Sequence, residues 1–134
     1  MSVGRRPKLK AKSKIWLELE AQPVFGDGKA RILEQVDRAG SLKAAAEALK
    51  MSYRGLWGRL REMERRFRVS LVSRRAGGRG GGATRLTPQG RELLRKYRQF
   101  RAGINKIVDA RFRKVFHRRK RGTRLRLPRG QTLC

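Results

Sequence analysis

Residues 52–67 constrain the fold of this chain more than any other segment, because they predict a helix with two unlike faces. At about 100° per residue, the members of the basic face lie within about 40° of Arg54: they are Gly58, Arg61, Arg65 and Arg68. The opposite face is apolar and carries Leu56, Leu60, Met63 and Phe67. A solvated helix face usually mixes charges of both signs, whereas this one contains arginine and no acid. The pattern predicts a helix that packs on a core with one side and offers arginine to an anion with the other.

Two shorter helices come before this segment, and the three together predict a helix-turn-helix. The first is expected over residues 28–38, with Asp27 as its cap, and Ala39-Gly40 ends it. Ser41 and Ser52 stand where the next two helices need a capping side chain. The alanines at 44–46 fit a close crossing of two helices, although an alanine run is also simply a good helix former. The arginine face that follows favours the helix-turn-helix.

Short strands surround this helical unit. Residues 15–21 alternate apolar and polar side chains, which predicts a strand with one buried face ended by Pro23. Residues 71–75 and 84–86 predict a pair of strands around a glycine-rich tip. The tip has the glycine spacing of a phosphate-binding loop, but Ala83 stands where that loop needs lysine and no helix opens after it. It has too few repeats for an RNA-binding arginine–glycine segment. A β-hairpin wing explains the flanking strands better than a linker does.

The last predicted helix covers residues 88–116 and starts at Thr87-Pro88. It would be about 43 Å long, more than a three-helix core needs. Its apolar stripe runs through Leu93, Tyr97, Phe100, Ile104, Val108 and Phe112. The stripe either lies back across its own domain or packs on a second copy. We favour a two-fold homodimer, which predicts a roughly palindromic DNA site.

Charge identifies the kind of partner. The chain has 37 Lys and Arg against 10 Asp and Glu, a net charge of +27. A surplus of this size is normally neutralised by a polyanion. Six basic residues and no acid occupy residues 1–14, and seven basic residues and no acid occupy 117–134. We therefore expect a basic N-terminal arm (1–14), a winged helix-turn-helix domain (15–87), a dimerisation helix (88–116) and a basic C-terminal tail (117–134).

Several function classes are disfavoured. The apolar stretches are too short for a membrane helix, and no apolar region follows the basic N-terminus as in a secretory signal. Cys134 cannot close an internal disulfide, and with one His and one Cys we expect no metal and no cofactor. The acids show no paired or metal-like spacing, so we expect no enzyme. RNA binding ranks low, because no aromatic RNA-binding motif is present. A cytoplasmic, nucleoid-associated DNA-binding protein is expected.

The first two turns of the arginine-faced helix are the expected DNA-reading surface. The predicted DNA-contacting residues are Ser41, Ser52, Tyr53, Arg54, Trp57, Arg61, Arg74, Arg75, Arg79 and Arg85. Arg54 and Arg61 fit either a bidentate contact to guanine or a grip on phosphate. Trp57 lies at the border of the two faces and is equally compatible with the core and with a DNA contact.

These motifs resemble the N-terminal DNA-binding domain of the molybdate-responsive regulators (ModE), a winged helix-turn-helix related to LysR-type regulators. The resemblance covers about residues 28–100. It rests on Gly40-Ser41-Leu42-x-x-Ala45-Ala46, Met51-Ser52-Tyr53-Arg54-x-x-Trp57, Leu71-Val72, the Arg75–Gly82 glycine run and Leu86-Thr87-x-x-Gly90. The Ser-Tyr-Arg-x-x-Trp run with the glycine hairpin is its most specific part.

The resemblance implies that Ser52, Tyr53 and Arg54 begin the recognition helix and touch DNA. It implies that residues 77–82 form the wing tip and that residues 88–116, with the N-terminal segment, make a homodimer. Molybdate-sensing members carry a further C-terminal domain, whereas residues 117–134 here are a basic tail. We therefore expect either a stand-alone regulator or one that works with a separate effector-sensing protein.

Two functions fit these sequence features. The first is a sequence-specific, double-stranded DNA-binding transcription regulator that acts as a homodimer. Its recognition helix (about 52–67) lies in the major groove, and its wing (74–85) lies on the backbone or minor groove. The second is an architectural protein that coats DNA with little sequence preference, which the two acid-free arms favour because backbone contacts need only charge.

Overall fold

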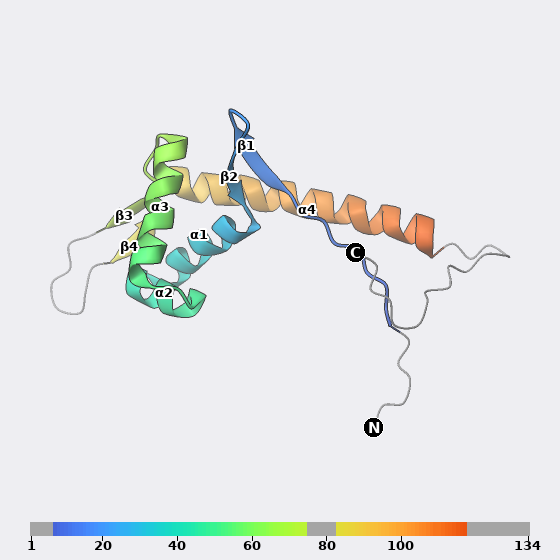
Figure 1. Cartoon of the computed structure of the whole chain (residues 1–134), viewed down its shortest axis with the longest axis horizontal. Coiled ribbons are helices and arrows are strands. Elements are labelled where there is room, and N and C mark those ends of the chain that lie inside the picture. Colours follow the sequence, from blue (N-terminus) through green and yellow to red (C-terminus); the bar gives the residue numbers. More distant parts are fainter. Residues whose placement is uncertain (1–6, 75–82, 118–134) are drawn as a thin grey trace, which may run out of the picture. The chain divides into compact units, whose positions relative to one another are not determined.

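The computed structural model describes residues 7–74 and 83–117 (Figure 1). Its contacts divide into two compact units. One spans Lys14–Ala102, and the other includes residues 7–13 and 103–117 of the described chain. The elements, in chain order, are β1 (Trp16–Leu19), β2 (Gln22–Gly26), α1 (Asp27–Ala39), α2 (Leu42–Leu49), α3 (Tyr53–Phe67), β3 (Val72–Arg74), β4 (Thr84–Leu86) and α4 (Pro88–Phe116).

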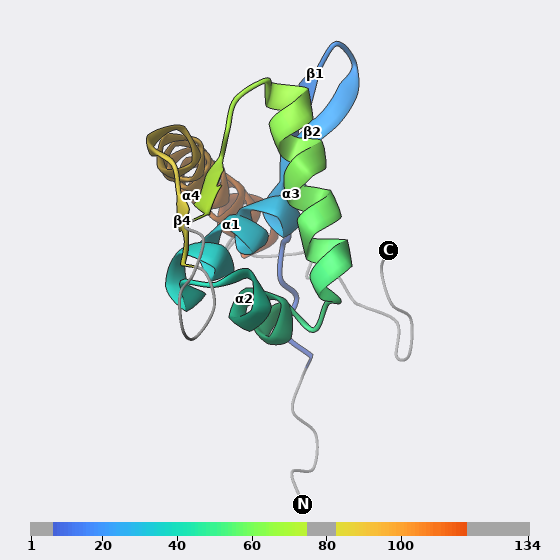
Figure 2. The ribbon, with the colours of Figure 1, turned by 90° about the vertical axis from the view of Figure 1, so that its left-hand side faces the viewer.

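The helix ends follow the predicted capping residues closely. The Ser41 hydroxyl accepts a hydrogen bond from the Ala44 amide at the start of α2, and Ser52 Oγ accepts one from the Gly55 amide at the start of α3. Gly40 ends α1 in the left-handed conformation, with φ of 72°, which glycine adopts without strain. These caps fix the two turns that join α1, α2 and α3. Figure 2 shows these three helices packed beside one another.

The start of α1 differs from the prediction. Asp27 is not a cap: the N-cap is Gly26, and no side chain caps this helix. The Asp27 carboxylate instead accepts hydrogen bonds from the Tyr97 hydroxyl and from Arg101, at 3.0 Å for the latter. Arg98 forms an ion pair with Glu34 of α1 at 2.8 Å. The polar side chains of α1 therefore bind the first half of α4.

The N-terminal strand also differs from the prediction. A second strand, β2, pairs antiparallel with β1, with an irregular register after Leu17. Pro23 therefore lies inside a two-stranded hairpin and does not end the sheet. The predicted buried face of the first strand was wrong, since Leu17 is only partly buried and Leu19 is 45% exposed. Val24 and Phe25 of β2 enter the core instead.

The hairpin predicted around the glycine-rich segment is confirmed at its base. β3 pairs antiparallel with β4, with Ser73 opposite Arg85. The Thr84 amide donates to Gly40 O at 2.8 Å, which joins β4 to the turn between α1 and α2. Residues 75–82, the predicted tip, lie outside the described residues.

One core fills the unit Lys14–Ala102. Leu33, Leu56, Leu60 and Met63 are fully buried in it, and the first half of α4 adds Leu94 and Tyr97. The Tyr97 ring packs edge-on against Phe25, with centroids 5.0 Å apart. The fold is therefore mainly helical with small β-hairpins, a helix-turn-helix with the base of a wing, and a long last helix, as predicted.

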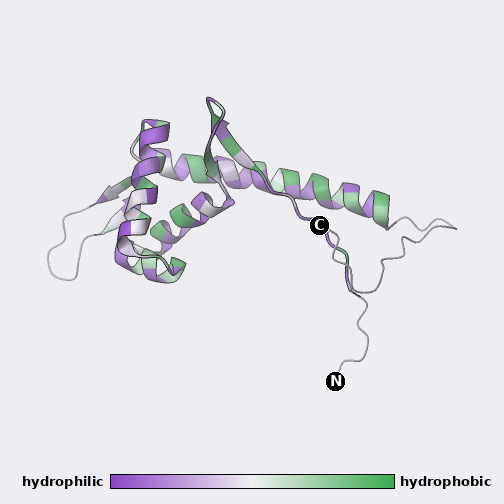
Figure 3. Cartoon of the chain, in the orientation of Figure 1, coloured by the Kyte–Doolittle hydropathy of each residue, from purple (hydrophilic) through white to green (hydrophobic). Residues whose placement is uncertain are grey.

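The second half of α4 carries exposed apolar side chains. Ile107 is 69% exposed, and Val115 and Phe116 are about half exposed. Figure 3 shows hydrophobic bands along this part of the helix. No helix within residues 7–74 and 83–117 is long and apolar enough to span a membrane.

Candidate nucleic-acid interface

The predicted division of α3 into a basic and an apolar face is present in the structure. Leu56, Leu60 and Met63 are fully buried, and Phe67 is partly buried against the same core. Arg54, Gly58 and Arg61 are exposed. Because the core holds the apolar face, the arginine side of α3 is fixed toward solvent.

Two glutamates on α3 bind neighbouring groups and leave part of the basic face unneutralised. Glu62 pairs with Arg65 and with Arg66, the latter at 3.0 Å. The hydrogen bond from Arg66 and the charge of Arg65 hold the pKa of Glu62 below its ordinary value. Arg65 is therefore partly neutralised by its own helix.

Glu64 serves the fold and not the basic face. Its carboxylate accepts hydrogen bonds from the Leu71 amide at 2.8 Å and from the Ser70 hydroxyl at 3.3 Å. It therefore fastens the segment that leads into β3. Among the described residues, Arg54 forms no ion pair and no hydrogen bond through its side chain, and Arg61 forms only a ring contact with Trp57. These two guanidinium groups remain available to an anion.

Trp57 brings the wing base and α3 together. The Arg74 guanidinium of β3 lies over the Trp57 ring, 4.3 Å from its centroid, and that of Arg61 lies 5.4 Å away. Arg74 also donates a hydrogen bond to the Tyr53 hydroxyl. Contacts of cations with an aromatic face are favourable and hold the guanidinium in place. An aromatic pair on α3 thus orients one arginine from each element.

A pocket of about 490 Å³ opens at this junction. Its lining combines the aromatic wall with three arginines and the strand edge: Trp57, Arg61, Glu64, Arg68, Val69, Ser70, Val72 and Arg74. Trp57 is half-buried and packs on the core while its ring is covered by arginine. Both interpretations of this residue therefore keep support.

The other predicted DNA contacts lie around this surface with different surroundings. Ser41 and Ser52 are capping residues, and Arg85 is exposed on β4. Arg75 and Arg79 lie outside the described residues. The contact between Arg74 and Trp57 was not predicted, because no local sequence pattern pairs residues 17 positions apart.

The predicted dimer residues separate into two groups. Leu93 packs against the core of the protomer and Tyr97 is buried in it. Phe100 is 48% exposed, and Ile104, Val108 and Phe112 are half-buried. Within residues 7–74 and 83–117, no three His, Cys, Asp or Glu side chains gather in a group that could hold a metal ion.

Comparison with known protein families identifies the helical unit. Residues 28–91 match the family described as bacterial regulatory helix-turn-helix protein, lysR family. This segment contains α1 from its second residue, the α2–α3 pair, the β3–β4 hairpin and the start of α4. Residues 28–91 are therefore a LysR-type helix-turn-helix domain.

Individual relatives match the same part of the chain. The molybdenum transport protein ModE of Azotobacter vinelandii is 33% identical over 93 residues, which are 69% of this chain and 34% of that protein. The DNA-binding transcriptional dual regulator ModE of Escherichia coli K12 is 32% identical over 77 residues, 57% of this chain and 29% of that protein. The chain thus spans about a third of the length of these relatives.

The solved structures that are similar to this chain include the CbnR DNA-binding domain in complex with DNA. It matches with a TM-score of 0.49 and 21% identity, over 63% of this chain and 91% of that one.

Proposed function

From the LysR-type helix-turn-helix domain at residues 28–91, we propose that this chain is a sequence-specific, double-stranded DNA-binding transcription regulator. In this proposal α3 enters the major groove and the β3–β4 wing lies on the backbone or minor groove. The names of the relatives support it, since one is called a DNA-binding transcriptional dual regulator. The proposal includes no catalysis and no cofactor.

The observation that carries the proposal is the solvent-facing side of α3. Arg54 and Arg61 project from its first turns without an acidic partner among the described residues. Arginine in these turns can bind guanine through two hydrogen bonds or hold a phosphate. Arg74, held on Trp57, adds a guanidinium from the wing base beside them. A single duplex could meet all three.

Binding of genomic DNA tests the proposal. Fragments retained by the protein at moderate salt, once sequenced, should share a motif. An enriched duplex should bind at least roughly a thousandfold more tightly than mixed-sequence duplex. Equal affinity for all fragments contradicts the proposal.

The homodimer is part of the proposal and rests on α4. The apolar stripe of Phe100, Ile104, Val108 and Phe112 lies along one side of this helix of 29 residues, with Phe100 48% exposed and the other three half-buried. A second copy of the same helix would cover this surface by two-fold symmetry. Sedimentation equilibrium at micromolar concentration should give twice the 15.4 kDa chain mass. A mass equal to that of one chain at this concentration would contradict the homodimer.

The second candidate is a DNA-coating protein with little sequence preference. The basic segments 1–14 and 117–134, which contain no acid, favour it because phosphate contacts carry no sequence information. It predicts a steep fall of affinity with salt and similar affinity for every duplex. The genomic selection above separates the two candidates.

The signal that would control such a regulator is a separate part of the proposal. The relatives are named for molybdenum transport as well as for DNA binding. We propose that any effector is sensed by a separate protein that contacts the regulator. We also propose that the regulator is cytoplasmic and associated with the nucleoid.

A further inference from the structure

Gly58 lies in the middle of α3, where a glycine is costly. Glycine loses more backbone freedom on folding than any other residue, so a helix interior that contains it is less stable than one with alanine. Its φ lies outside the left-handed region, so its backbone does not require glycine. A Cβ at this position would meet nothing within 4 Å. The folded chain itself therefore gives no reason for glycine here.

Neighbouring glycines show what an internal reason looks like. A Cβ at Gly55 would lie 2.9 Å from Ser52 Oγ, the hydroxyl that caps α3. A Cβ at Gly90 would lie 2.2 Å from Leu71 O. A Cβ at Gly90 would displace backbone and one at Gly55 would displace the capping hydroxyl, whereas Gly58 faces open solvent.

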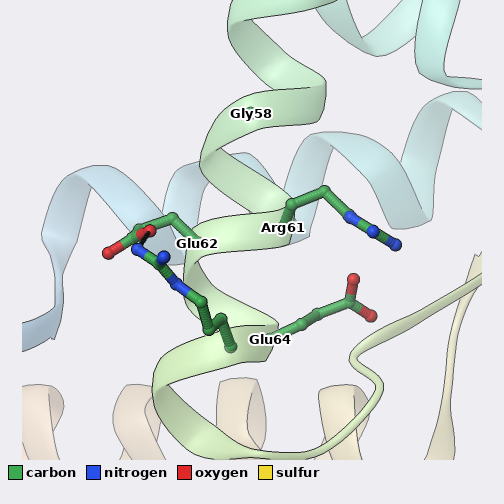
Figure 4. Close-up of a pocket in the computed structure, with 5 residues that line it drawn as sticks. Gly58, Arg61, Glu62 and Glu64 are labelled. Carbon is green, nitrogen blue, oxygen red and sulfur yellow. Dashed lines mark hydrogen bonds and ion pairs between the residues drawn. The ribbon is translucent and has the colours of Figure 1, made fainter.

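The surroundings of Gly58 indicate what approaches it. Gly58 lies one turn from Arg54 and one turn from Arg61 on the same exposed face. Figure 4 shows the Arg61 side chain extending away from the helix, while the ribbon at Gly58 carries no side chain. The pocket over this face, about 460 Å³, is lined by Gly58, Arg61, Glu62, Glu64 and Arg65. The bare stretch of helix is thus bordered by the Arg61 and Arg65 side chains, while the two glutamates of the lining bind arginines of α3 and the Leu71 amide.

We propose that Gly58 is the point of closest approach between the α3 backbone and base edges of duplex DNA, and so a specificity-determining position. The missing side chain lets the helix enter the groove deeply enough for Arg54 and Arg61 to reach the bases on either side. This inference rests on the proposed function, since it assumes that α3 enters the major groove. It adds that affinity for DNA is gained at the expense of helix stability at this residue.

The variants Gly58→Ala and Gly58→Leu test the inference, because stability and binding should change in opposite directions. Both should raise the thermal midpoint, Gly58→Ala by about 4 °C. On a duplex enriched by the wild-type protein from a random pool, affinity should fall about tenfold for Gly58→Ala and more for Gly58→Leu. On mixed-sequence duplex it should change less than about twofold, because base edges are not read there.

Gly28→Ala is the matched control, since Gly28 is an exposed glycine of α1 whose Cβ would also meet nothing within 4 Å. It should leave both affinities unchanged. The inference is overturned if Gly58→Ala binds the enriched duplex like the wild type, or loses equal affinity on both duplexes. If the wild type itself binds no duplex DNA or prefers none, the proposed function fails, which is a different result.

Discussion

Arg54 is an exposed arginine in the first turn of α3 whose side chain has no partner among the described residues. If Arg54 binds a guanine edge, the substitution Arg54→Ala weakens binding to the enriched duplex by about 1–3 kcal/mol and relaxes specificity at one base position. We expect this result, because the first turn of a recognition helix is the part that meets bases. Fluorescence anisotropy with enriched and mixed duplexes measures it.

Arg59→Ala is the control for this prediction. Arg59 is exposed on the same helix but lies about 140° around it from Arg54. Its removal should change affinity little. A uniform loss for Arg54→Ala on every duplex, with a salt slope smaller by about one, would assign Arg54 to phosphate instead.

Tyr97 gives the domain a dependence on alkaline pH. Burial and the neighbouring Asp27 carboxylate raise the pKa of Tyr97 to about 12. In the unfolded chain a tyrosine ionises near pH 10, so between about pH 10 and 12 only the unfolded state gives up this proton. The contribution of Tyr97 to stability is therefore complete below pH 10 and is lost as the pH rises to 12.

Urea unfolding at pH 8 and at pH 11 measures this effect. The unfolding midpoint of the wild type should fall between the two, and that of Tyr97→Phe should fall less, because phenylalanine has no proton to lose. Tyr53 is an exposed tyrosine of α3, so the unfolding midpoint of Tyr53→Phe should fall as much as that of the wild type. Equal falls for Tyr97→Phe and the wild type would contradict the role of Tyr97.

At the scale of elements, α4 begins directly against the residue that precedes β3. Thr87 caps α4 by accepting a hydrogen bond from the Gly90 amide, and its own hydroxyl donates to Ser70 O at 2.6 Å. Gly90 passes so close to Leu71 that a Cβ would lie 2.2 Å from the Leu71 carbonyl oxygen. The start of α4 is therefore held by a close backbone contact as well as by the cap.

Gly90→Ala tests this contact. The added methyl group must displace the backbone of Leu71, and we expect a loss of about 1–3 kcal/mol in the free energy of unfolding. Gly103→Ala, on the same helix but with open space around its Cβ, should instead stabilise by about 0.5–1 kcal/mol. Chemical denaturation measures both free energies of unfolding. A Gly90→Ala protein as stable as the wild type would contradict the close contact with Leu71.

The elements show where sequence patterns suffice. Periodicity and capping residues predicted α2, α3, α4 and the β3–β4 hairpin, because local spacing and local hydrogen bonds decide these structures. β2 was missed because Pro23 was taken as a strand end, although proline is tolerated in an edge strand. Asp27 was taken as a cap because its partners Tyr97 and Arg101 are 70 or more residues away.

The candidate site follows the same division. The arginine face of α3 could be predicted, because it is a property of one helix. The position of Arg74 over Trp57 could not, because it depends on how β3 packs beside α3. The half-buried state of Trp57 likewise results from contacts with more than one element.

At the scale of the whole molecule, charge and specificity have different sources in this account. Of the net charge of +27, about half belongs to the acid-free segments 1–14 and 117–134. Such segments bind phosphate whatever the sequence. The LysR-type domain at residues 28–91, with the arginine face of α3, would supply the preference among sequences.

DNA binding by a chain reduced to residues 15–116 separates the contribution of the basic arms from that of the domain. Its dissociation constants for an enriched duplex and for mixed-sequence duplex are measured beside those of the full chain at the same salt. We expect the shortened chain to bind both duplexes more weakly, with a smaller salt slope, and to keep a preference near the full chain's value of roughly a thousandfold. A preference that falls to about one on removal of the arms would contradict it.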